Sequence, residues 1–526
     1  MWLISCDMVK PDIPLLAHPA GEQSSVEVLP EAVGLCADTF GGRVHVEWDP
    51  GTAATPLGQL PFFIEFLKLG GLFDPWVGDC PLTLTSPNAA AKRDILGTLL
   101  LAVLAGHQRY AHITALRGDA VNAALLGMRR VMSEDSVRRA LAKIDEAAGV
   151  DWLQRHLDYT FRPLLGEPWI LDVDTTVKPL YGRQEGAVIG YNPHKPGRPS
   201  HTYHSYAIAE LRLILEVEVQ AGNQHASKHS APGLWALLAR IGRAAWPQLL
   251  RGDCDWGTEA NMSRAERKGL PYLFKLRLTR NAKRLIERAM VEPGWLDAGH
   301  GWQGKQSSLR LVGWSRQRRV ILLRRPIERT VAVIDGDDTG RQLDLYFGEI
   351  TADPAAKVFE YAVLVTSLAD EVLTVAQLYR DRAAGENNFD ELKNHWGWGG
   401  FTTRDLQRCR LMARIVALIY NWWTLFVRLA DPNQHTEAIT SRPLLLYGVG
   451  RQTRHANQAT ITITSTHGKA GHVRRMLAEV VTFFKSLRPI AEQLSDLQRW
   501  YRILSRALVK YLKGRQLGPP PIPLPA

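Results

Sequence analysis

The chain has 526 residues, more than a single domain usually needs, so we expect two to four folded modules. Hydrophobic residues make up 45% of it and charged residues 22%, which excludes a largely disordered chain. Lys and Arg number 64 against 53 Asp and Glu, and the resulting net charge of +11 suits a polyanionic partner without indicating a fold.

The cysteines and the apolar runs indicate the cellular compartment in which the chain works. The five cysteines are scattered without CxxC spacing, which predicts neither a disulfide framework nor a cysteine zinc site and favours a reducing cytoplasm. The N-terminus lacks a basic start followed by a long apolar run, so we expect no secretory signal. The apolar run from Ile95 is too short to span a bilayer, and residues 415–429 contain Asn421 and Arg428, which predicts a buried or amphipathic helix. We therefore expect no membrane partner.

The first third of the chain divides into two parts. Residues 1–55 read as an irregular N-terminal segment, and residues 56–165 read as helical. One helix ends on Gly70 and Gly71, which suit a C-cap, and another begins after Ser133, where acids in the first turn suit the helix dipole. A short helix, a turn and this basic helix resemble a helix-turn-helix, although an ordinary solvated helix of a bundle fits equally well. We expect residues 56–165 to form a DNA-binding domain.

From Trp169 the hydrophobic period changes to two, as in a strand. Three strands, a helix, a strand, a helix and a strand follow within residues 166–277, which predicts a mixed sheet with helices packed on it. Residues 278–357 read as a β-rich insertion containing SLRLVGWS, RVILLRR, TVAVID and LDLYFGEI. Residues 358–400 return to a strand and a helix capped by Thr374. Residues 401–515 read as helical, and residues 516–526 as a Pro-rich tail.

Acidic residues stand at the ends of two predicted strands. Asp172 and Asp174 face the same side of one strand, because side chains alternate along it. Asp253 follows a second buried run, and Asp255 is the alternative on the same face. Solvated strand ends explain these acids as well as chemistry does, and the sequence does not choose within either pair.

The segment YRDRAAGENNFDELK, residues 379–393, reads as one helix with an unusual face. Tyr379, Arg382, Glu386 and Lys393 project within roughly 60° of one another at about 100° per residue. Asp390 shares that face and competes with Glu386 as its central carboxylate. A charged face is usually solvated. However, three carboxylates from two strands and one helix could instead hold two divalent cations, which prefer oxygen ligands and promote phosphodiester chemistry.

The same residues resemble a known family. Tyr379, Arg382, Glu386 and Lys393 match the Y-(2)-R-(3)-E-(6)-K motif of cut-and-paste bacterial DDE transposases. The segments LDVDTTVKPLYGRQEGAVIGYNPHKPGRPSH and RGDCDWG most resemble the transposases of insertion sequence family 1380. The resemblance covers residues 57–515.

This resemblance implies an α/β, RNase H-like catalytic core with an inserted β-rich module and helical N- and C-terminal regions. It implies Asp174, Asp253 and Glu386 as catalytic residues and as ligands of two Mg²⁺ ions, for which Mn²⁺ can substitute. Tyr379, Arg382 and Lys393 would bind DNA phosphates. The implied reaction nicks the element's end, and the freed 3′ hydroxyl then attacks the opposite strand to give a hairpin.

Further DNA contacts are expected outside that motif. Lys195 and Arg198 lie in a Gly- and Pro-rich loop that can follow a phosphate backbone or simply connect two strands. A tryptophan of the insertion is implied to stack on a flipped base, with Trp302 preferred, although a core role is the commoner one for each candidate: Trp295, Trp302 and Trp314. The insertion's arginines suggest a second DNA surface: Arg316, Arg318, Arg319, Arg324, Arg325 and Arg329.

The sequence is compatible with three functions. The first is a DNA transposase that binds its element's terminal inverted repeats and target DNA as a homodimer, in a bacterial cytoplasm at the nucleoid. The second is a metal-dependent nuclease without strand transfer, and the third is a DNA-binding relative whose catalysis has decayed. Three retained acids argue against decay.

Overall fold

The computed structural model describes residues 35–49, 51–86, 88–192, 195–327, 358–433, 435–456, 458–464, 468–488 and 493–518. The chain divides into two compact units, Met1–Thr52 and Ala53–Ala526. In the first unit, β1 (Leu35–Thr39) and β2 (Gly42–Val46) form an antiparallel hairpin, although the sequence predicted irregular structure there.

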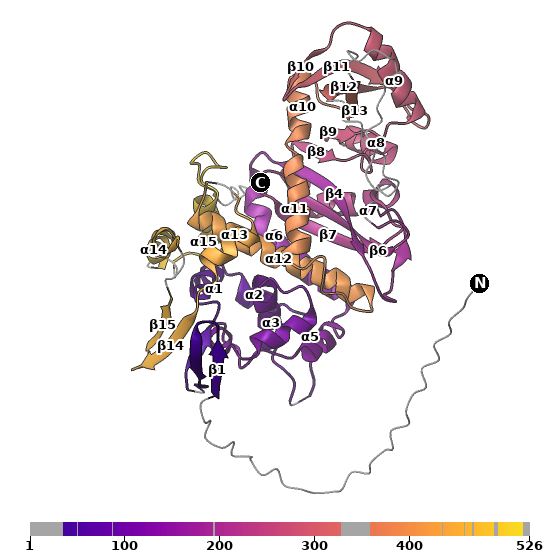
Figure 1. Cartoon of the computed structure of the whole chain (residues 1–526). Helices are drawn as coiled ribbons and strands as arrows, with labels where there is room; N and C mark the ends of the chain where they lie inside the picture. The colour runs from indigo at the N-terminus through magenta and orange to yellow at the C-terminus, as the bar shows by residue number, and fades with distance from the viewer. Residues whose placement is uncertain are drawn as a thin grey trace, which may run out of the picture. The chain divides into compact units, whose positions relative to one another are not determined.

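A large mixed sheet dominates the second unit (Figure 1). Its strands lie in the order β10-β11-β12-β13-β9-β8-β4-β6-β5, and β7 also pairs with β6. The central strands β9, β8 and β4 are parallel, and β4 pairs antiparallel with β6. The strands are β4 (Ile170–Pro179), β5 (Val188–Ile189), β6 (Pro199–Ile208), β7 (Leu213–Ala221), β8 (Leu249–Gly252), β9 (Tyr272–Lys275), β10 (Leu296–Gly299), β11 (Trp302–Leu309), β12 (Arg318–Ile327) and β13 (Val358–Thr366). The predicted mixed α/β sheet is therefore confirmed.

The described strands of the β-rich segment continue the large sheet. Among the described residues, β12 pairs with β13, and β13 pairs with β9, so the segment's strands extend the same sheet. The segment also begins with a helix, α9 (Arg280–Val291). The predicted strand SLRLVGWS is wrong beyond Leu309, where β11 ends, because a turn follows at residues 312–313. TVAVID and LDLYFGEI lie outside the described residues.

The region before the sheet, residues 56–165, is helical as predicted. Its helices are α1 (Leu60–Leu69), α2 (Phe73–Gly78), α3 (Lys92–Leu104), α4 (Ala120–Leu125), α5 (Glu134–Leu141) and α6 (Glu146–Phe161), with 3₁₀ turns at Tyr110–Leu116 and Arg162–Gly166. Gly70 is the C-cap of α1, and the Ser133 side chain accepts a hydrogen bond from the Ser136 amide at the start of α5, as predicted.

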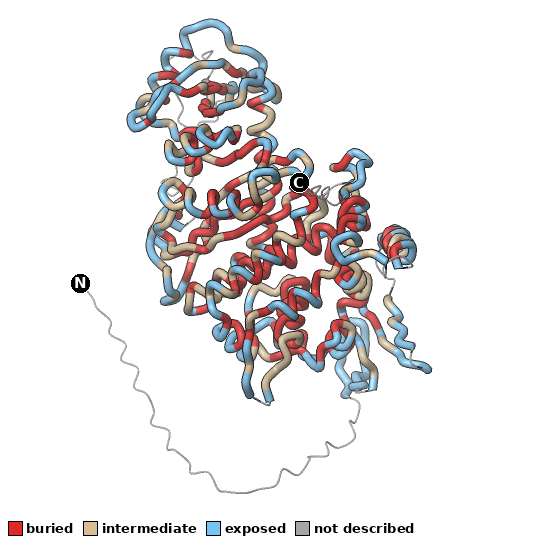
Figure 2. The backbone as a smooth tube through the Cα atoms, turned by 180° about the vertical axis from the view of Figure 1, so that it is seen from behind, coloured by how far each residue is buried: buried red, intermediate tan, exposed pale blue. Residues whose placement is uncertain are grey.

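The core is built around one long apolar helix, α12 (Leu406–Ala430), which packs against β7, α6 and α1 (Figure 2). The buried Asn421 does not interrupt this packing, because its side chain donates to the Ile214 carbonyl and accepts from the Ile214 amide. That contact satisfies both backbone groups of Ile214 beside an irregular register of β6 and β7. The predicted buried helix at residues 415–429 is confirmed.

Further helices cover the sheet and complete the C-terminal region. They are α7 (Ala226–Ile241), α8 (Glu259–Arg267), α10 (Val372–Arg380), α11 (Ala383–Asn394), α13 (Ala438–Leu445), α14 (Ala470–Leu487) and α15 (Asp496–Ala507), with a 3₁₀ turn at Arg243–Ala245. Between α13 and α14, β14 (Gly450–His455) and β15 (Gln458–Ile463) form a hairpin, and β14 also pairs with β3 (Ala53–Thr55). The region predicted as purely helical therefore contains strands. None of the described helices is long and apolar enough to cross a membrane.

Candidate active site

Two acids meet where β8 ends beside β4. These strands are parallel with Val173 opposite Gly252, so Asp174 and Asp253 follow at neighbouring positions on adjacent strands. Gly252 packs tightly here, because an added Cβ would lie 2.8 Å from Val173 Cγ2 and 2.9 Å from Trp256 Cβ. The backbone holds both carboxylates in place: Asp174 Oδ1 accepts from the Thr175 amide at 2.8 Å, and Asp253 Oδ1 accepts from the Asp255 amide at 2.9 Å.

The two carboxylates share one guanidinium. Arg382 Nη2 lies 2.5 Å from Asp174 Oδ2, and its charge also opposes the rise that burial causes in the pKa of Asp253. Burial nevertheless raises the pKa of Asp174 to about 7, with the Asp253 charge adding to the rise. Burial likewise raises the pKa of Asp253. The charge of Arg382 thus acts on both half-buried acids, and it offsets only one of the two negative charges when both acids are ionised.

The alternative acids have partners of their own. Asp172 forms a bidentate ion pair with Arg251, with Nε to Oδ1 at 2.6 Å and Nη2 to Oδ2 at 2.7 Å. Asp255 pairs with Arg277. Each predicted pair therefore separates into one acid held by its own arginine and one acid that shares Arg382.

The predicted helix through residues 379–393 is two helices. Helix α10 begins after Glu371, so the predicted Thr374 cap is wrong, and it ends at Arg380, whereas α11 begins after Arg382. Because α10 ends there, the Leu378 carbonyl has lost its helical partner, and Arg251 Nη1 donates to it. Sequence reasoning missed this role of Arg251. Its position directly across the parallel strands from Asp172 is the signal, but it emerges only once the strand register is known.

The break places the predicted phosphate-binding residues around the carboxylates. Arg382 lies at the junction of the two helices. Burial is the main cause of the raised pKa of the half-buried Tyr379, and the charges of Arg382, Asp253 and Asp174 also affect that pKa. Burial lowers the pKa of Lys393, and the charges of Asp390 and Asp174 oppose that shift. Tyr379, Arg382 and Lys393 are therefore all brought to the Asp174 side of the sheet.

The third predicted acid is only partly described. Glu386 lies in α11, but its side chain is outside the described residues. Its competitor Asp390 is exposed and accepts a hydrogen bond from Asn394 Nδ2 at 2.6 Å. Glu391, in the same helix, is buried and accepts hydrogen bonds from Trp396 and the Ala438 amide and pairs with His435.

The donor set at the sheet edge fits a divalent cation. Asp174 and Asp253 supply hard carboxylate oxygens with surplus negative charge. Arg382 Nε and Thr175 Oγ1 are buried without a hydrogen-bond partner among the described residues. The site therefore has a free N–H donor and a free hydroxyl group that a bound ligand could contact. In the described part of the chain, no three His, Cys, Asp or Glu side chains form a metal cluster, and the Glu386 side chain is not part of that set.

The remaining predicted DNA contacts lie elsewhere. Lys195 and Arg198 are exposed and flank the exposed ring of Tyr181, with Lys195 Nζ at 5.1 Å and the Arg198 guanidinium carbon at 4.8 Å from its centroid. Trp302 is half-buried against the small core under α10, and the Arg325 guanidinium lies 5.0 Å from its ring. Trp314 is buried, with 8% exposed, and is not accessible for base stacking.

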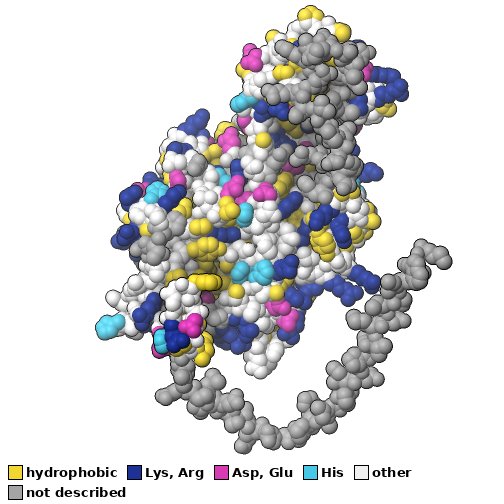
Figure 3. Space-filling view, in the orientation of Figure 1, with side chains coloured by type: hydrophobic (Ala, Val, Ile, Leu, Met, Phe, Trp, Pro, Cys, Tyr) yellow, Lys and Arg dark blue, Asp and Glu magenta, His cyan; other side chains and the backbone are white. Residues whose placement is uncertain are grey.

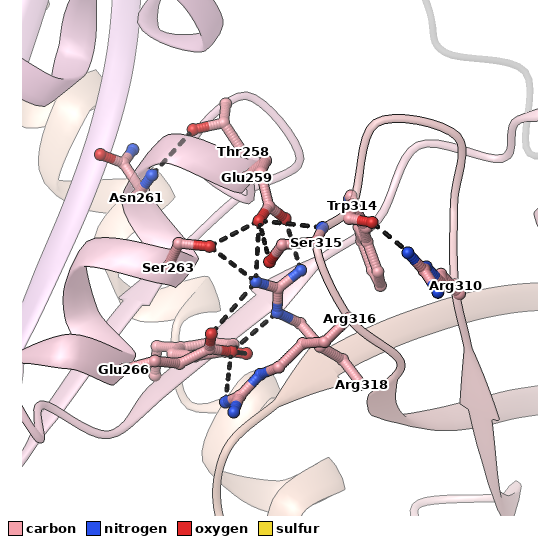
Figure 4. A network of polar contacts seen from close by, with 11 residues as sticks. Thr258, Glu259, Asn261, Ser263, Glu266, Arg310, Trp314, Ser315, Arg316 and Arg318 are labelled. Atoms are coloured by element: carbon pink, nitrogen blue, oxygen red, sulfur yellow. Dashed lines mark hydrogen bonds and ion pairs between the residues drawn. The ribbon is translucent and has the colours of Figure 1, made fainter.

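The predicted arginine surface on the β-rich segment is corrected at Arg318. This side chain is buried and pairs with Glu259 at 2.5 Å and Glu266 at 2.7 Å, so it joins β12 to α8 rather than facing DNA (Figure 4). Arg316 also pairs with Glu266 but is largely exposed. Arg329 lies outside the described residues.

Comparison with known proteins agrees with the motif. The family model described as "Transposase DDE domain group 1" matches residues 88–483. A solved structure of the piggyBac transposase synaptic complex with hairpin DNA is similar, with 12% identity, 90% of this chain and 89% of that chain covered, and a TM-score of 0.39. No curated protein matches the chain. Since the family model spans most of the chain, including both strands of the carboxylate pair and helix α11, the chain belongs to the group 1 family of DDE-domain transposases.

Proposed function

We propose that the chain is a DNA transposase of an insertion sequence, related to family 1380, that binds its element's ends, cleaves them and joins the 3′ ends to target DNA. Its catalytic part would be an RNase H-like core made of the central strands and α11. The observation that carries this proposal is the Asp174–Asp253 pair, two half-buried acids on adjacent strands that are both influenced by the charge of Arg382. Glu386 would complete the set as the third ligand.

The position of Glu386 in its helix supports that third role. Lys393 follows it by seven residues in α11, so the two positions lie on the same side of the helix, within about 20° of each other. The charge of Asp174 acts on Lys393, although less strongly than that of the neighbouring Asp390, so the Lys393 end of this side of α11 lies near Asp174. Asp390, exposed and bonded to Asn394, suits solvent better.

The chain's own groups suggest a division of labour. Two divalent ions held by Asp174, Asp253 and Glu386 would neutralise the attacking and the leaving oxygen of a phosphodiester. Arg382 holds the acids together before DNA binds, and its unused Nε can donate to a phosphate. Lys393 and the Tyr379 hydroxyl would hold the terminal phosphates, and Lys195 and Arg198 would follow the backbone further out. Two copies of the chain would act on the two ends.

The test is an excision and joining assay in Mg²⁺ or Mn²⁺, on a plasmid that carries a marker between the two DNA segments flanking the gene. We expect Asp174→Asn, Asp253→Asn and Glu386→Gln each to abolish cleavage, while Asp390→Asn on the same helix stays active. Cleavage without joined products would support the nuclease instead. Normal cleavage by Asp174→Asn would refute the assignment.

A further inference from the structure

The hairpin of β14 and β15 is a ribbon that the fold does not need for its core. Figure 1 shows it extending away from the helices that surround α12. Each strand has six residues, about 20 Å in length, and β3 pairs with only the first three residues of β14, Gly450 to Gln452. The outer part of the ribbon therefore lacks a neighbouring strand among the described residues, and the described side chains of that part, at residues 453–456 and 458–460, are exposed.

The two faces of the ribbon carry different side chains, although each has one exposed arginine. The register is regular, with Arg451 opposite Thr462 and His455 opposite Gln458, so alternate residues share a face. One face holds six exposed side chains, all able to form hydrogen bonds and none acidic or apolar: Arg451, Thr453, His455, Gln458, Thr460 and Thr462. We call this the polar face. The opposite face carries the half-buried Gln452, Ile461 and Ile463 and the exposed Arg454.

The opposite face of the ribbon contacts the rest of the second unit at its base. Ile463 lines a cavity of about 850 Å³ together with Leu444, Val473 and Leu477, which belong to α13 and α14. The polar face consequently points away from that anchor. Helix α14 also carries the exposed Arg474 and Arg475, and Arg474 lines the same cavity as Ile463, so a cationic side chain lies near the base of the ribbon (Figure 3).

We propose that the polar face enters the major groove of double-stranded DNA and reads base edges there. The proposal rests on the proposed transposase function and names the element that recognises its ends. A two-stranded ribbon fits the major groove, which is about 12 Å wide. Arg donates to guanine O6 and N7, Gln pairs with adenine N6 and N7, and Thr contacts either an acceptor or the thymine methyl. An ordinary solvated face mixes both signs of charge, whereas this one has no acid to repel DNA. Arg474 and Arg475 would contact the adjacent phosphates.

The ribbon supplies its own matched control. Arg451 and Arg454 are both exposed, three residues apart on β14, but they lie on opposite faces. Replacing either with Ala removes the same charge, so a purely electrostatic role predicts the same weakening for both. A reading role predicts that only Arg451→Ala changes which sequences are bound, because base contacts specify while phosphate contacts only position.

The experiment selects duplexes from a pool with 20 random base pairs, using the full-length chain, and sequences the bound fraction. We expect a defined site for the wild type and for Arg454→Ala, and a relaxed base preference at one position for Arg451→Ala, with affinity for the selected site about tenfold lower. Replacing the guanine or adenine at that position with its 7-deaza form removes only a major-groove acceptor. It should weaken the wild type by a similar factor and leave Arg451→Ala unaffected.

Three outcomes would overturn the proposal: equal and uniform weakening by both substitutions, indifference of the wild type to 7-deaza bases, or selection of no site. Asp174→Asn separates this failure from failure of the proposed function, since it should select the same site without cutting it. If Asp174→Asn loses cleavage while Arg451→Ala still selects like the wild type, the ribbon assignment falls and the transposase assignment stands.

Discussion

At the scale of single residues, the acids of the site are distinguished by whether each forms an ion pair with an arginine of its own. Asp172 and Asp255 are each held by their own guanidinium, whereas Asp174 and Asp253 share Arg382. Two half-buried carboxylates beside Arg382 cannot both ionise without cost, so the pair retains a proton to a higher pH than an isolated Asp would. A divalent cation would relieve the same imbalance.

This imbalance makes metal binding depend on pH. With the pKa of Asp174 raised to about 7, a cation must displace a proton below that pH. We expect the apparent affinity for Mn²⁺ to rise by up to about tenfold per pH unit between pH 6 and 7 and to level off above. Titration calorimetry in buffers of different ionisation enthalpy measures both the affinity and the proton release. An affinity that is constant from pH 6 to 8 would contradict the shared proton.

The raised pKa of Asp174 also makes the stability of the metal-free protein depend on pH. Because the folded pKa lies above the unfolded value, the contribution of Asp174 is most favourable below the unfolded pKa of 3.8 and is lost as the pH rises through about 7. Metal added at neutral pH should therefore stabilise the wild type and have little effect on Asp174→Asn.

At the scale of elements, the junction of α10 and α11 is held by a residue of the sheet. Arg251 bonds Asp172 on β4 and the Leu378 carbonyl in the last turn of α10, and its side chain is only 3% exposed. It thereby fixes where α10 ends, and the next turn presents Arg382 to Asp174. Arg251 is a positioning residue, since it acts on the site through the helix end.

Arg251→Met should destabilise the protein by about 3–5 kcal/mol, because it leaves the partly buried Asp172 charge unpaired. Adding Asp172→Asn removes that charge, so the double variant should be more stable than Arg251→Met alone. Urea denaturation followed by tryptophan fluorescence compares the three chains. If the second substitution restores no stability, the ion pair is not what Arg251 contributes.

At the scale of the whole molecule, the two compact units predict where the chain can be cut. A chain beginning at Ala53 keeps β3, and its melting temperature should stay within about 2 °C of the wild type. A chain beginning at Pro56 loses β3 and the buried Thr55, whose hydroxyl donates to Asp119 at 2.6 Å, so it should melt at least several degrees lower. Differential scanning calorimetry of the two truncations decides this, and equal melting temperatures would show that β3 is dispensable.

Local patterns in the sequence predicted much of this arrangement. Period-two alternation gave the strand that carries Asp172 and Asp174, and continuous apolar character gave the buried helix α12. The pattern failed at residues 379–393, where helical periodicity runs through a break that depends on Arg251, 127 residues before Leu378. It also failed at Arg318, since an arginine in a strand looks the same whether it meets solvent or two glutamates of α8.

The sequence by itself determined which side of each strand its acids face, where the buried helix lies, and that the motif residues match the DDE transposases. Those features follow from periods of two and 3.6 residues and from spacing within one segment. Only the tertiary structure decided which acids share Arg382, that the strands after residue 295 extend the central sheet, and that one predicted helix is two. Each of these depends on charges and strand edges that are distant in the chain and meet only in the folded protein.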